Sequence, residues 1–156
     1  MQTLWRDSGD EAAYESARLK NVFNLRRPTH RPLAAIQATC AADVLKGVEL
    51  ARSQKCQVAV RSGGHSIPVW SLHPDSILID LGNWKETEVN PGARIAIATP
   101  SITSKELNSA LATHGLMFPG GHCPDVGLGG FMLQGGMGWN SRVCVKALSC
   151  LLRIIR

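Results

Sequence analysis

The chain has 156 residues, 44% of them hydrophobic and 19% charged, which suits a globular domain with a buried core and not a disordered chain. Its formal net charge is +5, but the basic residues form no long run and no nucleic-acid-binding motif occurs, so a solvated surface explains the excess more simply. Five cysteines without a Cys-x-x-Cys pair argue against a disulfide framework and a structural zinc site.

Targeting segments are not recognisable in the sequence. Residues 1–16 are polar and acidic and lack the apolar centre of a secretory signal, and no apolar stretch approaches the roughly 20 residues of a membrane span. We therefore expect a protein of the cytosol with no membrane partner. The sequence does not indicate its oligomeric state.

The first predicted elements form a βαβ unit. Residues 1–32 are expected to be a helical or irregular approach, and residues 33–38 are a short apolar run that fits a buried strand. Residues 42–54 have apolar side chains at helical spacing, and residues 57–60 are the next strand. The apolar positions of this helix are Val44, Leu45, Val48 and Ala51. Strand, helix and strand within about 30 residues indicate parallel pairing.

A second group of elements follows this unit. Residues 76–81 are apolar and β-branched and predict a third strand, while residues 88–90 and 94–98 flank Pro91-Gly92 and predict a hairpin. Parallel and antiparallel strands mixed with helices predict the α+β class.

A short helix is predicted after the hairpin. Thr103 and Glu106 have the spacing of a capping box, and Gly115 is suited to the first position after the C-cap. The apolar face of this helix consists of Leu107, Ala110 and Leu111.

The first candidate site is the loop after residues 57–60. Its residues are Arg61, Ser62, Gly63, Gly64, His65 and Ser66. Adjacent glycines can direct backbone N–H groups at a phosphate, but the loop matches neither the Walker pattern nor G-x-G-x-x-G, and a Gly-Gly pair is also common in ordinary turns. His65 could be a surface residue, a base, a nucleophile or a metal ligand. A metal set with His73, His122 and Cys123 matches no standard zinc spacing.

The second candidate site is the glycine-rich segment 120–138, GGHCPDVGLGGFMLQGGMG. Each glycine would destabilise an ordinary helix by roughly 1 kcal/mol, so this number of glycines implies a benefit elsewhere. Close contact with a large planar or phosphorylated ligand is one such benefit, and tight packing of a helix on a sheet is the other. Cys123 is either a buried, inert thiol or, in a positive setting, a reactive thiolate.

Together the two sites resemble the FAD-binding, PCMH-type domain of the vanillyl-alcohol oxidase family, specifically of the berberine-bridge-enzyme-like oxidases. The matching segments are VAVRSGGHS (58–66), SILIDLG (76–82) and GHCPDVGLGGFMLQGGMGWNSR (121–142), and residues 31–52 look like the family's opening strand and helix. The resemblance implies an N-terminal βαβ subdomain, followed by the start of a second, mainly antiparallel subdomain that is incomplete at the C-terminus.

The resemblance also divides the chain. It implies an N-terminal approach at residues 1–30, a partial FAD-binding PCMH-type domain at residues 31–142 and a divergent tail at residues 143–156. Because the rest of the family's flavin domain and its substrate domain would follow residue 142, we expect the 156 residues alone to be inactive.

A cofactor and its ligands follow from the resemblance as well. In the family a histidine after R-S-G-G, here His65, is joined to the 8α-methyl group of the isoalloxazine, and in doubly linked members a cysteine in G-x-C-P-x-V-G-x-G-G, here Cys123, is joined to C6. The expected FAD-binding residues are Arg61, Ser62, Gly63, Gly64, His65, Ser66, Gly121, Cys123, Val126, Gly127, Gly129, Gly130, Gly135, Gly136 and Gly138. No metal ligand and no catalytic residue is assigned.

The implied activity is hydride transfer from a small organic substrate, such as a sugar, an alkaloid or another secondary metabolite, to flavin and then to O₂. Two alternatives stay open. One is a catalytically inactive fragment of a flavin domain. The other is a small basic nucleic-acid-binding protein, against which the aromatic content of 5% counts because such proteins stack bases on aromatic side chains.

Overall fold

A computed structural model describes residues 2–25, 27–140 and 142. The chain folds as two units, Met1–Trp84 and Lys85–Arg156. No helix among the described residues is long and apolar enough to cross a membrane. The divergent tail expected at residues 143–156 lies outside the described residues.

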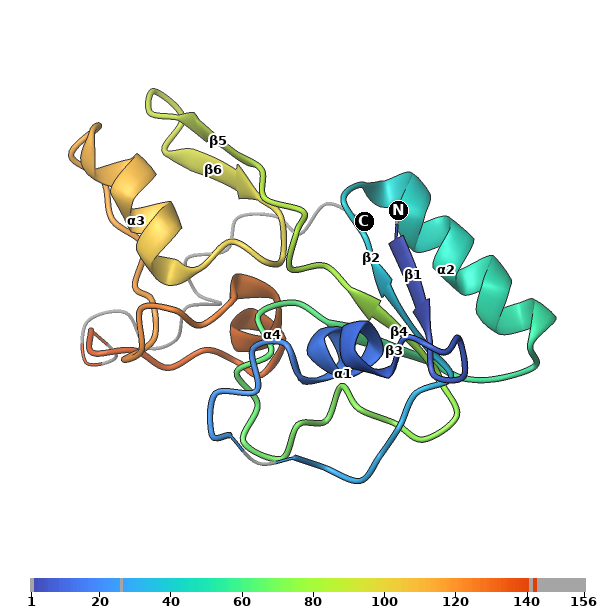
Figure 1. The fold of residues 1–156 in the computed structure, drawn as a ribbon. Helices are drawn as coiled ribbons and strands as arrows, with labels where there is room; N and C mark the ends of the chain where they lie inside the picture. The colour runs from blue at the N-terminus through green and yellow to red at the C-terminus, as the bar shows by residue number, and fades with distance from the viewer. Residues whose placement is uncertain (1, 26, 141, 143–156) are drawn as a thin grey trace. The chain divides into compact units, whose positions relative to one another are not determined.

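A four-stranded sheet forms the centre of the first unit (Figure 1). Its strands are β1 (Gln2–Trp5), β2 (Ala34–Gln37), β3 (Val58–Arg61) and β4 (Ile77–Asp80), in the order β1-β2-β4-β3. Both β2 and β3 pair in parallel with β4, whereas β1 pairs antiparallel with β2. The predicted parallel arrangement is confirmed, but β2 and β3 are not neighbours because β4 lies between them.

The strand β1 lies in the segment that the sequence predicts to be a helical or irregular approach. That prediction was wrong for Gln2–Trp5, which is too short to show a pattern of its own and pairs through Thr3 opposite Ile36 and Leu4 opposite Ala35. Helix α1 (Glu11–Leu19) follows β1 and agrees with the prediction of helical structure in this segment.

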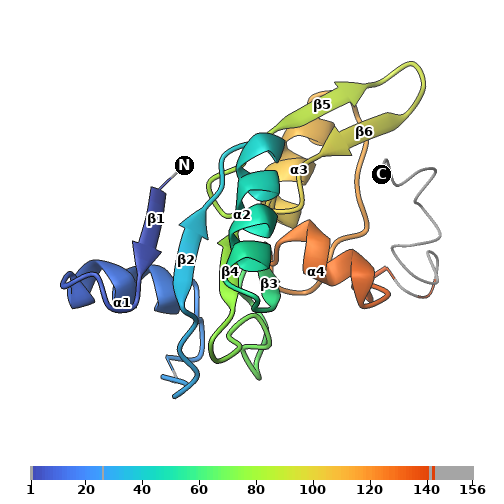
Figure 2. The same cartoon turned by 90° about the vertical axis from the view of Figure 1, so that its right-hand side faces the viewer.

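Two helices, α1 and α2 (Ala41–Ser53), pack on opposite faces of this sheet (Figures 1 and 2). Leu78 packs with Ala17 of α1 on one face, and Ile79 packs with Ala51 of α2 on the other. All four residues of β4 are buried, the pattern of a strand that is covered on both faces.

The buried face of α2 differs from the predicted one. Ala51 is buried and Val44 half-buried, but Leu45 is 65% exposed and Val48 is exposed as well. Gly47 takes the central contact, since a methyl group there would lie 2.7 Å from Cδ1 of Ile79. The helix is therefore rotated so that Gly47 and Ala51 face the sheet, an orientation that a count of large apolar side chains does not show.

The second unit contains the predicted hairpin and capped helix. Strands β5 (Thr87–Asn90) and β6 (Ile95–Ala98) pair antiparallel. Helix α3 (Ser104–Ala112) begins at the predicted capping box: the Glu106 N–H donates to Oγ1 of Thr103 (3.2 Å), and the Thr103 N–H donates to the Glu106 carboxylate (2.7 Å).

The C-terminal end of α3 and its buried face are also close to what the sequence predicts. The sequence predicts that Gly115 is the first residue after the C-cap. Because Thr113 is the C-cap, Gly115 is instead the second residue after it, and it has the left-handed conformation (φ +65°). Leu107 and Leu111 pack with Leu128 of a further helix, α4 (Leu128–Leu133).

Candidate cofactor-binding site

The candidate loop of the first unit leaves the carboxyl end of β3. Strands β2, β4 and β3 are parallel, so their carboxyl ends lie at one edge of the sheet. Ligands of open parallel sheets bind beyond this edge. Residues 62–66 are all half-buried there, which leaves part of each residue accessible to a ligand.

The side chain of Arg61 points into the protein and not toward the surface. It is 2% exposed, and its guanidinium donates to the carbonyl of Arg18 (2.7 Å), the carbonyl of Ala17 (2.6 Å) and the carboxylate of Asp80 (2.9 Å). The Arg61 carbonyl in turn accepts from the N–H of Leu81 (2.8 Å). The guanidinium thus anchors the start of the loop to α1 and β4.

Gly64 and His65 are held by the segment after α1. Gly64 has φ +73°, and a methyl group there would lie 2.9 Å from Cβ of Asn21. The imidazole of His65 stacks on the ring of Phe23, with centroids 4.3 Å apart and planes at 12°. Phe23 could not be found from the sequence, because nothing local links an isolated aromatic residue to a histidine far along the chain.

The second candidate segment is fastened to the start of α3. The N–H of Ser104 donates to the carbonyl of Val126 (3.2 Å), and the N–H of Lys105 donates to the carbonyl of Pro124 (3.0 Å). Cys123 is exposed and its thiol is free. The expectation that this thiol is buried is therefore wrong.

At some positions of this segment, contacts or backbone conformation within the protein explain why the residue is glycine. A methyl group on Gly138 would collide with the carbonyl oxygen of Gly120, and one on Gly121 would lie 3.0 Å from the ring of Phe131. Gly135 has φ +90° and Gly136 has φ +46°, conformations that other residues rarely adopt. Close contacts within the second unit and turn geometry are therefore structural reasons for these glycines, and neither is the packing of a helix on a sheet that the sequence left open.

Gly127, Gly129 and Gly130 lie at α4. The N–H of Gly129 donates to the carbonyl of Pro100 (2.8 Å), and the N–H of Leu128 donates to the carbonyl of Ile102 (2.9 Å). These two N–H groups are thus used within the protein. Gly129 is half-buried and Gly130 is exposed, so their Cα surfaces are accessible to a ligand.

A groove of about 510 Å³ also lies in the second unit, between α3 and residues 118–124 and 139–140. The ring of His122 packs against Trp139 at its rim, with centroids 4.1 Å apart. The buried Oγ of Ser104, one of the lining residues, has no hydrogen-bond partner within the described part of the chain. Among residues 2–25, 27–140 and 142, no group of three or more His, Cys, Asp and Glu side chains could hold a metal ion.

The comparison with known families decides the assignment. A family model described as an FAD binding domain matches residues 32–153. The chain belongs to this family. FAD is accordingly the cofactor of this domain, and the resemblance drawn from the two motifs is confirmed.

Relatives of this FAD-binding domain are long proteins. The FAD-linked oxidoreductase penO of Penicillium crustosum is 49% identical over 140 residues, which are 90% of this chain and 30% of that protein. The FAD-linked oxidoreductase janO of Penicillium janthinellum is 45% identical over 139 residues, 89% of this chain and 31% of that protein. The chain thus spans less than a third of the length of these relatives.

Solved structures confirm the α+β fold of the FAD-binding domain. Wild-type BBE-like 1 of Physcomitrella patens has a TM-score of 0.81 and is 29% identical, and the match covers 95% of this chain and 31% of that one. The predicted PCMH-type fold is therefore correct.

Proposed function

We propose that the chain is the flavin-binding part of an FAD-linked oxidoreductase and that His65 and Cys123 bind the cofactor covalently. The observation that carries this proposal is the half-buried imidazole of His65, which is held in a preformed loop beyond the carboxyl ends of parallel strands. The names of penO and janO support the redox activity. The exposed thiol of Cys123, in the glycine-rich segment, is accessible for a second link.

When bound, FAD supplies a ring that accepts a hydride from a substrate carbon and passes the electrons to O₂. The residues of the chain hold this ring: His65 offers an imidazole nitrogen, Cys123 offers a thiol, and the glycines let the backbone approach closely. Fixing a cofactor in this way sets its orientation and tunes its reduction potential. The proposed remaining contacts come from the other loop residues and from the glycine-rich segment, and Arg61 contributes by anchoring the start of the loop.

The substrate that we propose is a small organic molecule, such as a sugar, an alkaloid or another secondary metabolite. We propose a cytosolic protein without a nucleic-acid or membrane partner. The FAD-binding domain proper comprises residues 31–142 in this proposal, and residues 1–30 are an N-terminal approach whose strand joins the first sheet beside β2 and whose helix packs on that sheet.

Alanine at Gly129 or Gly130 is expected to lower the flavin content of the purified protein by a larger factor than it lowers the soluble yield. The reason is that their accessible Cα surfaces allow a close approach that a methyl group would block. Gly138→Ala is the matched control and is expected to lower the soluble yield itself, since the methyl group meets the Gly120 carbonyl. Flavin absorbance per mole of protein measures the effect. Full flavin occupancy in both variants would show that close approach is the wrong explanation.

The 156 residues alone are expected to show no oxidase turnover. Catalysis needs a substrate held over the ring with water excluded, and the chain spans only about 30% of the penO relative. Purified chain, reconstituted with FAD and offered sugars and alkaloids, should produce no peroxide above a control with free flavin. Steady, substrate-dependent production of peroxide would overturn this expectation.

A further inference from the structure

Phe23 has no part in the motifs from which the site was predicted. It lies before the residues 32–153 that match the family model, and its side chain is 46% exposed. A large aromatic side chain with this exposure contributes little to a core, so its position needs another reason. Its one ring contact among the described residues is the parallel stack on His65.

Three residues of the segment around Phe23 contact the cofactor loop or the residue just after it. Asn21 lies against Gly64, Phe23 stacks on His65, and the side-chain amide of Asn24 donates to the carbonyl of Ile67 (3.0 Å). Asn21 has φ +61° and Leu25 has φ +57°, both in the left-handed region that non-glycine residues seldom occupy. The turn is therefore bent into an unfavourable backbone shape, and the contacts with the loop hold it there.

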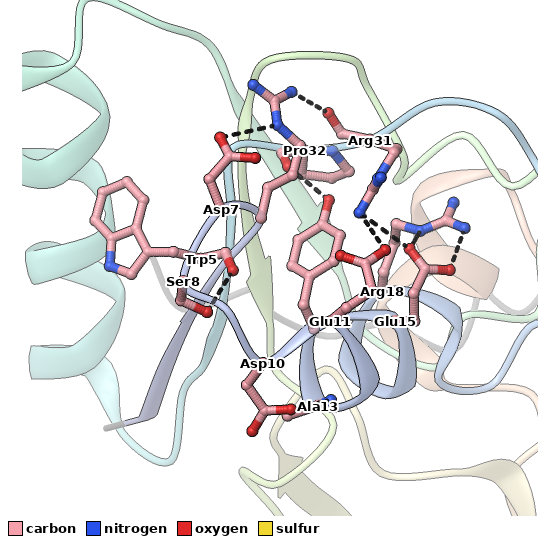
Figure 3. A network of polar contacts seen from close by, with 12 residues as sticks. Trp5, Asp7, Ser8, Asp10, Glu11, Ala13, Glu15, Arg18, Arg31 and Pro32 are labelled. Carbon is pink, nitrogen blue, oxygen red and sulfur yellow. Dashed lines mark hydrogen bonds and ion pairs between the residues drawn. The ribbon is translucent and has the colours of Figure 1, made fainter.

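The helix before this turn is firmly fixed (Figure 3). Arg18 forms two hydrogen bonds to the Glu15 carboxylate (2.8 and 2.7 Å) and donates to the carbonyl of Pro28 (2.7 Å), while Arg31 pairs with Glu11 (2.6 Å). The hydrogen bond from Arg18 lowers the pKa of the Glu15 carboxyl. These contacts tie both ends of α1, and so the helix before the turn that carries Phe23, to residues 28–31.

We propose that Phe23 is a positioning residue that orients the imidazole of His65 for its covalent link to flavin. The terminal torsion of histidine is broad and roughly two-fold, so a free imidazole samples many orientations. A ring stacked at 12° on Phe23 keeps one plane, with its nitrogen atoms directed along that plane, and His65 as a whole is half-buried. Attack on a fixed carbon needs this alignment, because reactivity falls steeply when reacting atoms are misplaced. The inference rests on the proposed function of His65.

The test uses the natural protein that carries this chain, in a Cys123→Ala background in which His65 is the one proposed point of attachment. Apoprotein from riboflavin-depleted cells is mixed with FAD in air-saturated buffer. O₂ is the required oxidant, because forming the carbon–nitrogen bond leaves two electrons and two protons on the ring, which O₂ removes as H₂O₂. Acid-stable flavin is measured against time at several FAD concentrations. The non-covalent dissociation constant comes from fluorescence quenching in the same background with His65→Ala added.

Phe23→Leu is expected to lower the first-order rate constant of linkage at saturating FAD by about 10-fold or more, while the dissociation constant and the melting temperature change little. Phe23→Tyr keeps a stacking ring and should restore the rate. Trp5→Leu is the control, since Trp5 is a partly exposed aromatic residue on β1, at the opposite edge of the sheet from β3.

The outcomes separate the two proposals. A parent protein without acid-stable flavin at His65 refutes the proposed covalent link, and the role of Phe23 falls with it. A parent protein that links flavin, together with a Phe23→Leu variant that links it at the same rate, refutes the positioning role alone. Equal losses in the rate constant, the affinity and the melting temperature would also refute it, because they would show a purely structural effect.

Discussion

Replacing both His65 and Cys123 by alanine is expected to abolish covalently bound flavin in the natural protein. Each single variant should keep one link: flavin mass on the Cys123 peptide when His65 is replaced, and on the His65 peptide when Cys123 is replaced. The physical reason is that each residue offers one nucleophilic atom, from a half-buried imidazole and an exposed thiol. Acid precipitation followed by peptide mass spectrometry measures the result.

The matched controls are His73→Ala and Cys40→Ala, which remove an exposed histidine and an exposed, free cysteine from the first unit. Neither should change the flavin mass on either peptide. Release of all flavin into the acid supernatant from the unaltered protein would defeat the covalent proposal. It would leave the assignment to the FAD-binding family untouched, since that rests on the match over residues 32–153.

Asp80→Leu is expected to destabilise the fold by about 3–5 kcal/mol, because it leaves the buried guanidinium of Arg61 without its counter-charge. Asp80 and Arg61 are 1% and 2% exposed, and their ion pair measures 2.9 Å. Arg61→Lys keeps the charge but cannot reach the same three acceptors, so an intermediate loss is expected. Urea unfolding followed by circular dichroism gives the free energies.

Arg6→Met is the control for this prediction, since the Arg6–Asp75 pair has a similar length (2.7 Å) but joins a half-buried arginine to an exposed aspartate. Its loss should stay within about 1 kcal/mol, the usual range for a solvated pair. If Asp80→Leu destabilised the protein no more than Arg6→Met, the buried pair would not anchor the loop. Arg61 would then not be a stabilising link between α1 and β4.

Local features of the fold could be predicted from the sequence because their causes lie within a few residues. The turn at Pro91-Gly92 and the exchange between Thr103 and Glu106 are of this kind. The strand β1 and the rotation of α2 could not be predicted, because they depend on β2 and on the contact of Gly47 with Ile79, which come from distant parts of the chain.

In the candidate site, too, local features could be predicted and contacts with distant parts of the chain could not. The positions of His65 and Cys123 within their motifs were accessible from the sequence, since the order of residues alone defines a motif. Arg61 is among the FAD-binding residues that the motif implies, yet its partners Ala17, Arg18 and Asp80 direct its side chain inward. The stack of Phe23 on His65 joins two segments that only the folded sheet and α1 bring together.

The central position of β4 has a consequence for biosynthesis. β4 is the last of the four strands to leave the ribosome, yet it is the shared partner of β2 and β3. A nascent chain therefore exposes β3, with the cofactor loop behind it, without a pairing partner until Ile77–Asp80 has emerged. Pairing between residues so far apart in sequence is slow and leaves strand edges open to aggregation. The start of the loop that carries His65 consequently gains its contact with Leu81 only after β4 has inserted into the sheet.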